Sequence, residues 1–267
     1  MRRYRRHRTS GREHAVDEHF GTHGLEAEPL SQEPDDDTTV RPFAEGDADQ
    51  DELPEVPLTK EGPDPARMLR RARRAARGGR QRDAIQAYRD LLEAAQDNIE
   101  GRLEMARLLE ADEDTSGAMT HLDRAVELAP DRPDVLTERG ALKARLKEYL
   151  AAAADLDSAL TLDAGYAPAH FHQGMVLLRK SRNGDAAISF RSALSHQADY
   201  PQARYYLGEA LNLMGEFDSA IATLEQAIES DPTDPRVYRL LGRVLDRCSR
   251  PEEAILLYQK AREVAGR

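Results

Sequence analysis

The sequence predicts an all-α solenoid of six helix–turn–helix units that follows an N-terminal tail. The first observation is a pattern that recurs every 34 residues, without insertion, from Pro65 to the end of the chain. A period of this length is typical of stacked helix pairs. The second observation is composition, because aromatic residues make up only 5% of the 267 residues and Trp is absent. Ala and Leu are plentiful, which favours helices over a β fold.

The repeated unit is clearest in residues 201–234, PQARYYLGEALNLMGEFDSAIATLEQAIESDPTD. With Pro201 as position 1, small residues occupy positions 8, 20 and 27, a large apolar residue occupies position 24, and Pro occupies position 32. The six units begin at Pro65, Ile99, Pro133, Ala167, Pro201 and Pro235. Small residues let two helices cross closely, and Pro cannot continue a helix. Each unit is therefore predicted to be a pair of packed helices.

This pattern resembles the tetratricopeptide repeat (TPR) family over residues 65–267. The resemblance implies a right-handed α-solenoid in which the first helix of each unit lines a concave groove through positions 2, 5, 6, 9, 12 and 13. It also implies a non-catalytic scaffold that binds a peptide or helix of another protein. One helix pair cannot bury its apolar face alone, so roughly three or more units are needed, and six suffice.

The N-terminal segment, residues 1–64, shows no hydrophobic periodicity. Residues 1–12 are rich in Arg, whereas residues 26–61 are acidic and rich in Pro. Such a composition buries too little apolar surface to offset chain entropy, so we expect a disordered tail before a solenoid domain of residues 65–267. The four histidines of the tail lack the spacing of a metal site, and we predict no metal.

Charge and motifs exclude several function classes. The net charge of −11 argues against a general nucleic-acid binder, and Cys248 is the only cysteine, so no disulfide framework is expected. No apolar run approaches the roughly 18 residues of a membrane span, and no apolar stretch follows the basic N-terminus as in a secretory signal. We therefore expect a cytoplasmic protein. Phosphate-binding, metalloprotease and hydrolase motifs are missing from the sequence, so we predict no enzyme and no cofactor.

The first unit is unusually basic. Its arginines form a predicted basic patch of Arg67, Arg70, Arg71, Arg73, Arg74 and Arg77. One interpretation is a polar cap that keeps the open end of the array soluble. The other is an anion-binding surface for an acidic partner or nucleic acid, which the acidic tail of the same chain would mask. A cap explains polarity but not charge of a single sign, so both interpretations stay open.

The predicted partner-binding groove lies in units four to six. Its residues, taken from the concave positions, are Phe171, His172, Met175, Tyr205, Tyr206, Glu209, Asn212, Arg236, Arg239 and Arg243. Aromatic side chains and Arg are favoured anchors at interfaces, and Asn can hold a peptide backbone. The alternative is that the tyrosines pack between neighbouring first helices. The Lys and Asn pair of the carboxylate-clamp subgroup, at positions 5 and 9, occurs in no unit.

The end of the last unit is a further candidate surface. Leu256 and Leu257 are expected to lack a following repeat that would cover them. An open apolar end would serve as a docking surface or as a contact for self-association. The sequence thus predicts a non-catalytic interaction scaffold for a protein partner, with nucleic-acid or acidic-partner binding through the first unit as the alternative.

Overall fold

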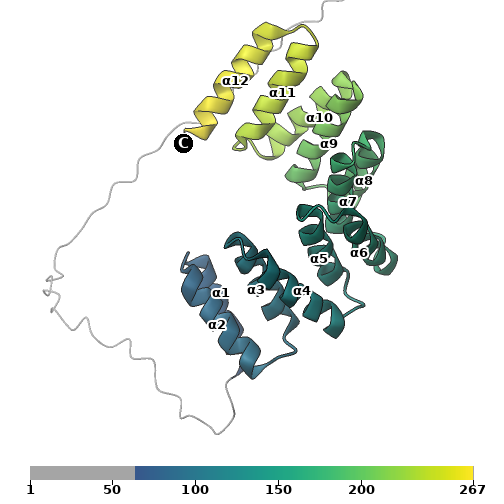
Figure 1. Cartoon of the computed structure of the whole chain (residues 1–267). Helices are drawn as coiled ribbons and strands as arrows, with labels where there is room; N and C mark the ends of the chain where they lie inside the picture. Colours follow the sequence, from purple (N-terminus) through teal and green to yellow (C-terminus); the bar gives the residue numbers. More distant parts are fainter. Residues whose placement is uncertain (1–63, 267) are drawn as a thin grey trace, which may run out of the picture. The chain divides into compact units, whose positions relative to one another are not determined.

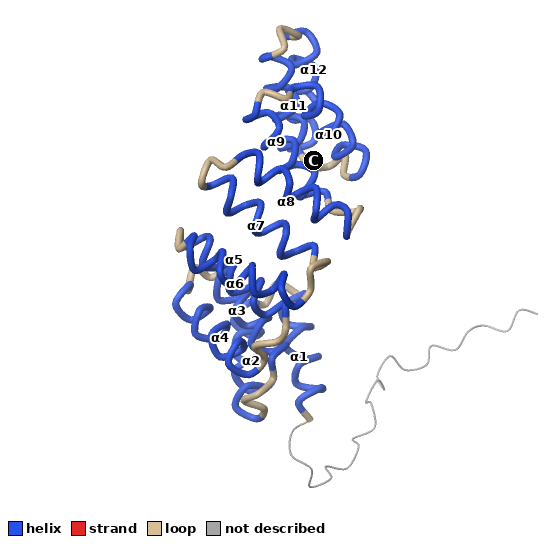
Figure 2. The backbone as a smooth tube through the Cα atoms, turned by 90° about the vertical axis from the view of Figure 1, so that its right-hand side faces the viewer, coloured by secondary structure: helices blue, strands red, loops and turns tan. Residues whose placement is uncertain are grey.

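The structure, a computed structural model, describes residues 64–266. The predicted tail, its disorder and the division between tail and solenoid lie outside or at the edge of this range and stay predictions. The described residues form twelve helices and no strand, joined by short loops (Figure 2). The helices are α1 Pro65–Arg77, α2 Gln81–Ala94, α3 Ile99–Ala111, α4 Thr115–Leu128, α5 Pro133–Arg145, α6 Tyr149–Leu162, α7 Ala167–Arg179, α8 Asn183–His196, α9 Pro201–Met214, α10 Phe217–Ser230, α11 Pro235–Arg247 and α12 Pro251–Ala265.

Local sequence explains where these helices begin and end. Pro occupies the first turn of α1, α5, α7, α9, α11 and α12, where its missing N–H costs nothing. Asn98 caps α3 by accepting a 2.7 Å hydrogen bond from the backbone N–H of Gly101, and Asp114 caps α4 in the same way. The helices α4 and α10 end two residues before Pro130 and Pro232.

The small residues bring the two helices of each unit together as the repeat predicts. A Cβ atom built on Gly174 would lie 2.6 Å from the Phe190 ring, and one on Gly208 would lie 2.6 Å from Leu224. These pairs occupy positions 8 and 24 of units four and five. Glycine is required there because a methyl group would overlap the facing side chain.

Each turn between the paired helices uses one residue with positive φ. That residue always stands at position 15, with φ between 58° and 82°. The six residues are Gly79, Glu113, Lys147, Ser181, Gly215 and Ser249. A left-handed residue just past the helix end is a common way to stop a helix and reverse the chain. Four of the six turns do so without glycine, at a cost of about 1 kcal/mol each.

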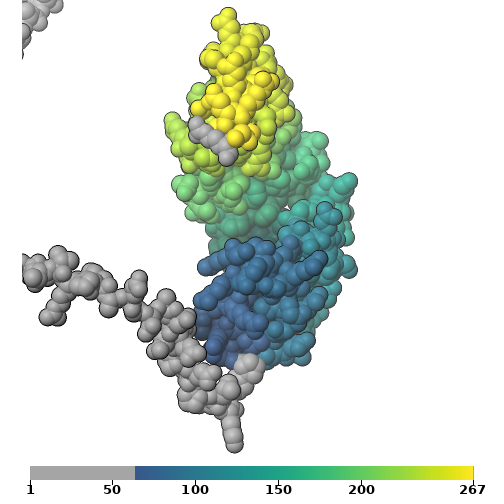
Figure 3. All heavy atoms as spheres, turned by 90° about the vertical axis from the view of Figure 1, so that its left-hand side faces the viewer, coloured from purple at the N-terminus to yellow at the C-terminus, as the bar shows by residue number. Residues whose placement is uncertain are grey.

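The six pairs follow one another along an arc from α1–α2 to α11–α12 (Figure 1). In the view from the open side of this arc, the middle units lie deeper than the first and last units (Figure 3). The buried side chains form three clusters, which span units one to three, three to four and four to six. The predicted all-α solenoid of six units is therefore confirmed.

The last helix differs in part from expectation. Leu257 is half-buried and packs against the core, so the prediction that it lacks cover is wrong. Leu256 is 65% exposed as expected, and Ile255 is 55% exposed. Leu256 stands at position 22, which is exposed in every unit, so its exposure does not come from the lack of a neighbouring unit. Self-association through this end stays a prediction.

Candidate functional site

The inner face, defined as the face that the odd-numbered helices form with their positions 2, 5, 6, 9, 12 and 13, has two chemically different halves. In the first half, position 9 of one unit pairs with position 6 of the next. Arg73 donates hydrogen bonds of 2.8 and 2.6 Å to Glu104 Oε1, and Arg107 forms an ion pair with Glu138. Both pairs bridge neighbouring units. The charges of this half therefore largely satisfy one another.

Glu104 is the most constrained residue of this ladder. Burial opposes its ionisation, but the hydrogen bonds from Arg73 and from the Tyr88 hydroxyl outweigh burial and lower its pKa. Burial, together with the same hydrogen bond, raises the pKa of Tyr88. A pocket of about 350 Å³ lies here, but its carboxylate is already occupied by Arg73 and Tyr88.

In the second half, Ala141 and Met175 take position 9 of units three and four, and His172 and Tyr206 take position 6 of the units that follow them. A pocket of about 570 Å³, here called the inner-face pocket, opens among units three to six. It is lined by Ala141, Ala144, Arg145, Lys147, Tyr149, Phe171, His172, Met175, Arg179, Gln202, Tyr206 and Arg236. This volume falls within the range of ligand pockets, about 300–1,000 Å³. It is larger than the pocket beside Glu104.

One wall of the inner-face pocket is a cluster of aromatic rings. The Phe171 ring lies with its centroid 5.0 Å from that of Tyr200, 5.8 Å from that of Tyr206 and 5.1 Å from that of His172. Ring pairs at these separations pack favourably. Burial raises the pKa of Tyr200 to about 12. The wall is thus aromatic, which suits an apolar side chain of a ligand.

The rim of the pocket is cationic. Arg145, Lys147, Arg179 and Arg236 line it, and no Asp or Glu is among the lining residues. Arg145 pairs with Glu110, and Arg236 donates a 2.7 Å hydrogen bond to Asp234. Within residues 64–266, Lys147 and Arg179 form no ion pair and are exposed. These two cations are open to an anionic ligand.

His172 is a neutral part of the wall. Burial lowers its pKa to about 4, nearby Glu138 opposes this shift, and Arg145 adds to it. The imidazole is therefore uncharged near pH 7. It offers one donor and one acceptor to a ligand without adding a positive charge.

The structure brings together five of the ten predicted groove residues. Phe171, His172, Met175, Tyr206 and Arg236 line the inner-face pocket. The other five, Tyr205, Glu209, Asn212, Arg239 and Arg243, do not line it.

Two of those five have clear structural contacts. Tyr205 packs edge-on against Tyr206 at 5.0 Å, and the Arg236 guanidinium lies 5.4 Å from its ring centroid. Asn212 is buried, and its side-chain oxygen accepts a 2.8 Å hydrogen bond from Arg247. Asn212 thus joins units five and six, and the expectation that it holds a peptide backbone has no support in its surroundings.

Most of the residues that sequence reasoning missed belong to unit three. Ala141, Ala144 and Arg145 stand at its positions 9, 12 and 13, and Arg179 stands at position 13 of unit four. The rule for concave positions would have found the three residues of unit three if it had been applied to that unit, and it includes position 13 of unit four, although Arg179 was not selected there. Lys147, at position 15 in the turn, gives no such signal.

The predicted basic patch divides between two faces of α1. Arg67, Arg71 and Arg74 stand at positions 3, 7 and 10 and are exposed. In units five and six the same positions hold buried residues that pack against the preceding pair. The three arginines therefore form an end face, whereas Arg70, Arg73 and Arg77, at positions 6, 9 and 13, belong to the inner face.

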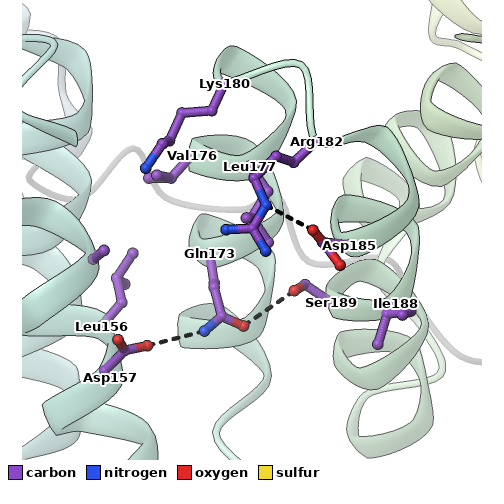
Figure 4. A pocket seen from close by; sticks show the side chains of 11 residues that line it. Leu156, Asp157, Gln173, Val176, Leu177, Lys180, Arg182, Asp185, Ile188 and Ser189 are labelled. Carbon is purple, nitrogen blue, oxygen red and sulfur yellow. Dashed lines mark hydrogen bonds and ion pairs between the residues drawn. The ribbon is translucent and has the colours of Figure 1, made fainter. Parts of the chain in front are cut away.

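A further hollow of about 330 Å³ lies among α6, α7 and α8 (Figure 4). At its centre, the Gln173 amide donates a 3.0 Å hydrogen bond to Asp157 and accepts one of 3.0 Å from Ser189. Arg182 donates a 2.7 Å hydrogen bond to Asp185 at its edge. Most of its polar lining is thus paired, so we place the candidate site at the inner-face pocket instead.

Comparison with known families agrees with this architecture. Two family models of the tetratricopeptide repeat match the chain, one over residues 69–133 and the other over residues 177–244. No curated protein matches the sequence. Repeats of this kind form protein-interaction scaffolds, which in general are not catalytic. No helix among the described residues is both long and apolar enough to cross a membrane.

Solved structures with the same fold include several repeat proteins. PilW, a type IV pilus biogenesis factor, is similar with a TM-score of 0.67 and 19% identity over 72% of this chain and 90% of its own. A tetratricopeptide repeat protein from Parabacteroides merdae has a TM-score of 0.63 and 20% identity, and the match covers 79% of this chain and 80% of that protein. YrrB, a TPR protein with an unusual peptide-binding site, has a TM-score of 0.51 and 20% identity, and the match covers 68% of this chain and 93% of YrrB. The chain belongs to the tetratricopeptide repeat family.

Proposed function

We propose that this protein is a non-catalytic adaptor that binds a peptide or helix of a partner protein in the inner-face pocket. The observation that carries the proposal is the pocket of about 570 Å³, which has an aromatic wall of Phe171 and Tyr206 and a cationic rim. Apolar pockets with a few convergent polar groups are the usual sites of recognition. The similarity of fold to YrrB, which has a peptide-binding site, is in keeping with this function.

The two halves of the inner face explain why the site lies in the second. In the first half, Arg73 and Arg107 are neutralised by carboxylates of the following unit. A ligand there would have to displace existing ion pairs. In the second half, Ala141, His172, Met175 and Tyr206 take the corresponding positions. A ligand can bury apolar surface there without breaking an ion pair, at about 25 cal/mol per Å².

A photo-crosslinking amino acid at Gln202 tests the proposal, because this residue is exposed and lines the pocket. In cells of the source organism we expect a covalent adduct with a protein partner, which Phe171→Ala abolishes. The matched control places the same group at Glu225, which is exposed on α10. Equal adduct yields at both positions, or a yield that Phe171→Ala leaves unchanged, would contradict the proposal.

A second candidate function uses the end face of α1. Arg67, Arg71 and Arg74 are exposed and form no ion pair within the described residues. Spaced four and three residues apart, they form one stripe that fits an acidic partner or a nucleic-acid backbone. Replacement of all three by Gln should then weaken binding to duplex DNA and flatten its dependence on salt. Binding that is absent in the unaltered protein at low salt would remove this candidate.

A further inference from the structure

We infer that the ligand of the inner-face pocket is an acidic segment with a large apolar side chain, whose carboxylates pair with Arg179 and Lys147. This inference rests on the proposed function, because it names the chemistry of the peptide that the same pocket would bind. It follows from a contact that occurs at two boundaries between units and that, within the described residues, lacks its side-chain acceptor at a third.

The recurring contact joins position 13 of one unit to position 12 of the unit before it. Arg145 stands at position 13 of unit three and pairs with Glu110, at position 12 of unit two. Arg247 stands at position 13 of unit six and donates hydrogen bonds of 2.8 and 2.9 Å to the side-chain and backbone oxygens of Asn212, at position 12 of unit five. Each arginine thus reaches back to an acceptor.

Arg179 occupies the same position in unit four, but position 12 of the unit before it is Ala144. A methyl group accepts no hydrogen bond, so within residues 64–266 Arg179 lacks the side-chain acceptor that its counterparts have. Both residues line the inner-face pocket. The place of the missing carboxylate therefore faces the pocket, where a ligand can supply it.

Lys147 adds a second uncompensated charge to the same rim. It lies in the turn that follows α5, and it lines the pocket together with Arg179. No Asp or Glu is among the lining residues, and the neutral His172 contributes no charge near pH 7. Two cations beside an aromatic wall favour carboxylates, because hydrogen bonds between charged groups are the strongest.

The wall between these cations indicates an apolar side chain in the ligand. Phe171, Met175 and Tyr206 line it, and Met adapts to side chains of different shapes. A nucleic acid would instead need a row of cations along its backbone, whereas only two of the cations that line the pocket are uncompensated within the described residues. An acidic protein segment with an aromatic or aliphatic residue fits both features.

Selection from a random peptide library on the full-length protein tests the inference. We expect recovered peptides to combine Glu or Asp with Phe, Tyr, Leu or Met. Replacement of the acids of a recovered peptide by Gln or Asn should weaken binding by about tenfold to a hundredfold, since hydrogen bonds between charged groups contribute about 1.5–3 kcal/mol. Arg179→Gln and Lys147→Gln should each weaken the binding of the acidic peptide by a larger factor than the binding of its neutral version.

The sharpest variant is Ala144→Glu, which supplies Arg179 with the carboxylate that Glu110 supplies to Arg145. It should abolish binding of the acidic peptide, whereas Ala144→Gln, of the same size, should retain most of it. Arg89→Gln with Arg191→Gln removes two exposed cations that do not line the pocket and serves as the control for net charge. Circular dichroism checks that each variant is folded.

The outcomes separate the inference from the proposed function. Recovered peptides without acids, whose binding Phe171→Ala abolishes, would overturn the inference and leave the adaptor function standing. Equal weakening by Ala144→Glu and Ala144→Gln would also overturn it. No recovered peptide, or peptides whose binding is indifferent to Phe171 and Arg179, would overturn both. Preferential binding of single-stranded DNA at this pocket would overturn them as well.

Discussion

Arg247 Nη1 lies 2.8 Å from Oδ1 of Asn212 and 2.9 Å from its backbone oxygen, so one guanidinium joins units five and six. The same guanidinium carbon lies 4.6 Å from the centroid of the Phe217 ring. Asn212 belongs to a concave position, yet it is buried by this contact. A residue type that suits peptide recognition thus serves the stacking of the repeats.

Asn212→Ala should therefore lower the free energy of unfolding rather than the affinity for a groove ligand. The expected loss is about 1.5 kcal/mol, at the low end for a hydrogen bond to a charged group, because Arg247 keeps its bond to the backbone oxygen. Urea unfolding measures the loss. A weaker peptide affinity with unchanged stability would instead show that Asn212 contributes to ligand binding in the groove.

Gly174→Ala should destabilise unit four, because the added methyl group would lie 2.6 Å from the Phe190 ring. Overpacking of this kind costs about 1–3 kcal/mol. Gly184→Ala is the matched control, since the nearest atom to its added methyl group is 3.9 Å away. That change should stabilise the helix by about 0.5–1 kcal/mol. Thermal unfolding of both variants checks the opposite signs.

Asp155→Ala should be among the most destabilising single changes in the third unit. Asp155 is 7% exposed, and it accepts hydrogen bonds of 2.8 and 2.7 Å from Arg139 and one of 2.8 Å from Lys143. Its removal leaves two poorly exposed cations without their partner, which costs about 3 kcal/mol. Asp123→Ala, which removes an exposed partner of Arg139, should cost at most about 1 kcal/mol. Similar urea midpoints for the two variants would contradict this account.

His172 should make stability depend on pH below neutrality. Burial lowers its pKa to about 4, whereas the unfolded chain has a histidine pKa of about 6.5. Between these values the unfolded state binds more protons, so stability rises with pH from about 4 to 6.5. His172→Gln should remove this part of the slope. An NMR titration of His172 that gives a pKa near 6.5 would show that burial does not act as described.

The turn residues at position 15 should respond to glycine in a predictable direction. Ser181 has φ of 58°, and Ser181→Gly should stabilise the protein by up to about 1 kcal/mol by relieving the left-handed conformation. Gly215 has φ of 82°, and Gly215→Ala should lower the free energy of unfolding by about 1 kcal/mol. The gain at Ser181 is reduced by the greater freedom of glycine in the unfolded chain. Chemical unfolding of the two variants measures the sign of each change in the free energy of unfolding.

The sequence by itself determined the helices, their register and the close contacts within each unit. Gly174 faces Phe190 because positions 8 and 24 of one unit lie on helices joined by a short turn, and this relation repeats with the period. Half of the predicted groove residues also line the inner-face pocket, because the concave positions follow from the same period.

Only the tertiary structure decided which charges are neutralised and which stay open. Arg73 meets Glu104 at a separation of 31 residues, and Asn212 is covered by Arg247 at a separation of 35. Among the described residues, Arg179 meets no side-chain acceptor, because the equivalent position in the preceding unit is Ala144. Such contacts depend on how far long side chains reach across the boundary between stacked units. The residue type at a single position does not say which residue of the adjacent unit its side chain contacts. The open cations of the site can therefore be identified only when neighbouring units are considered together.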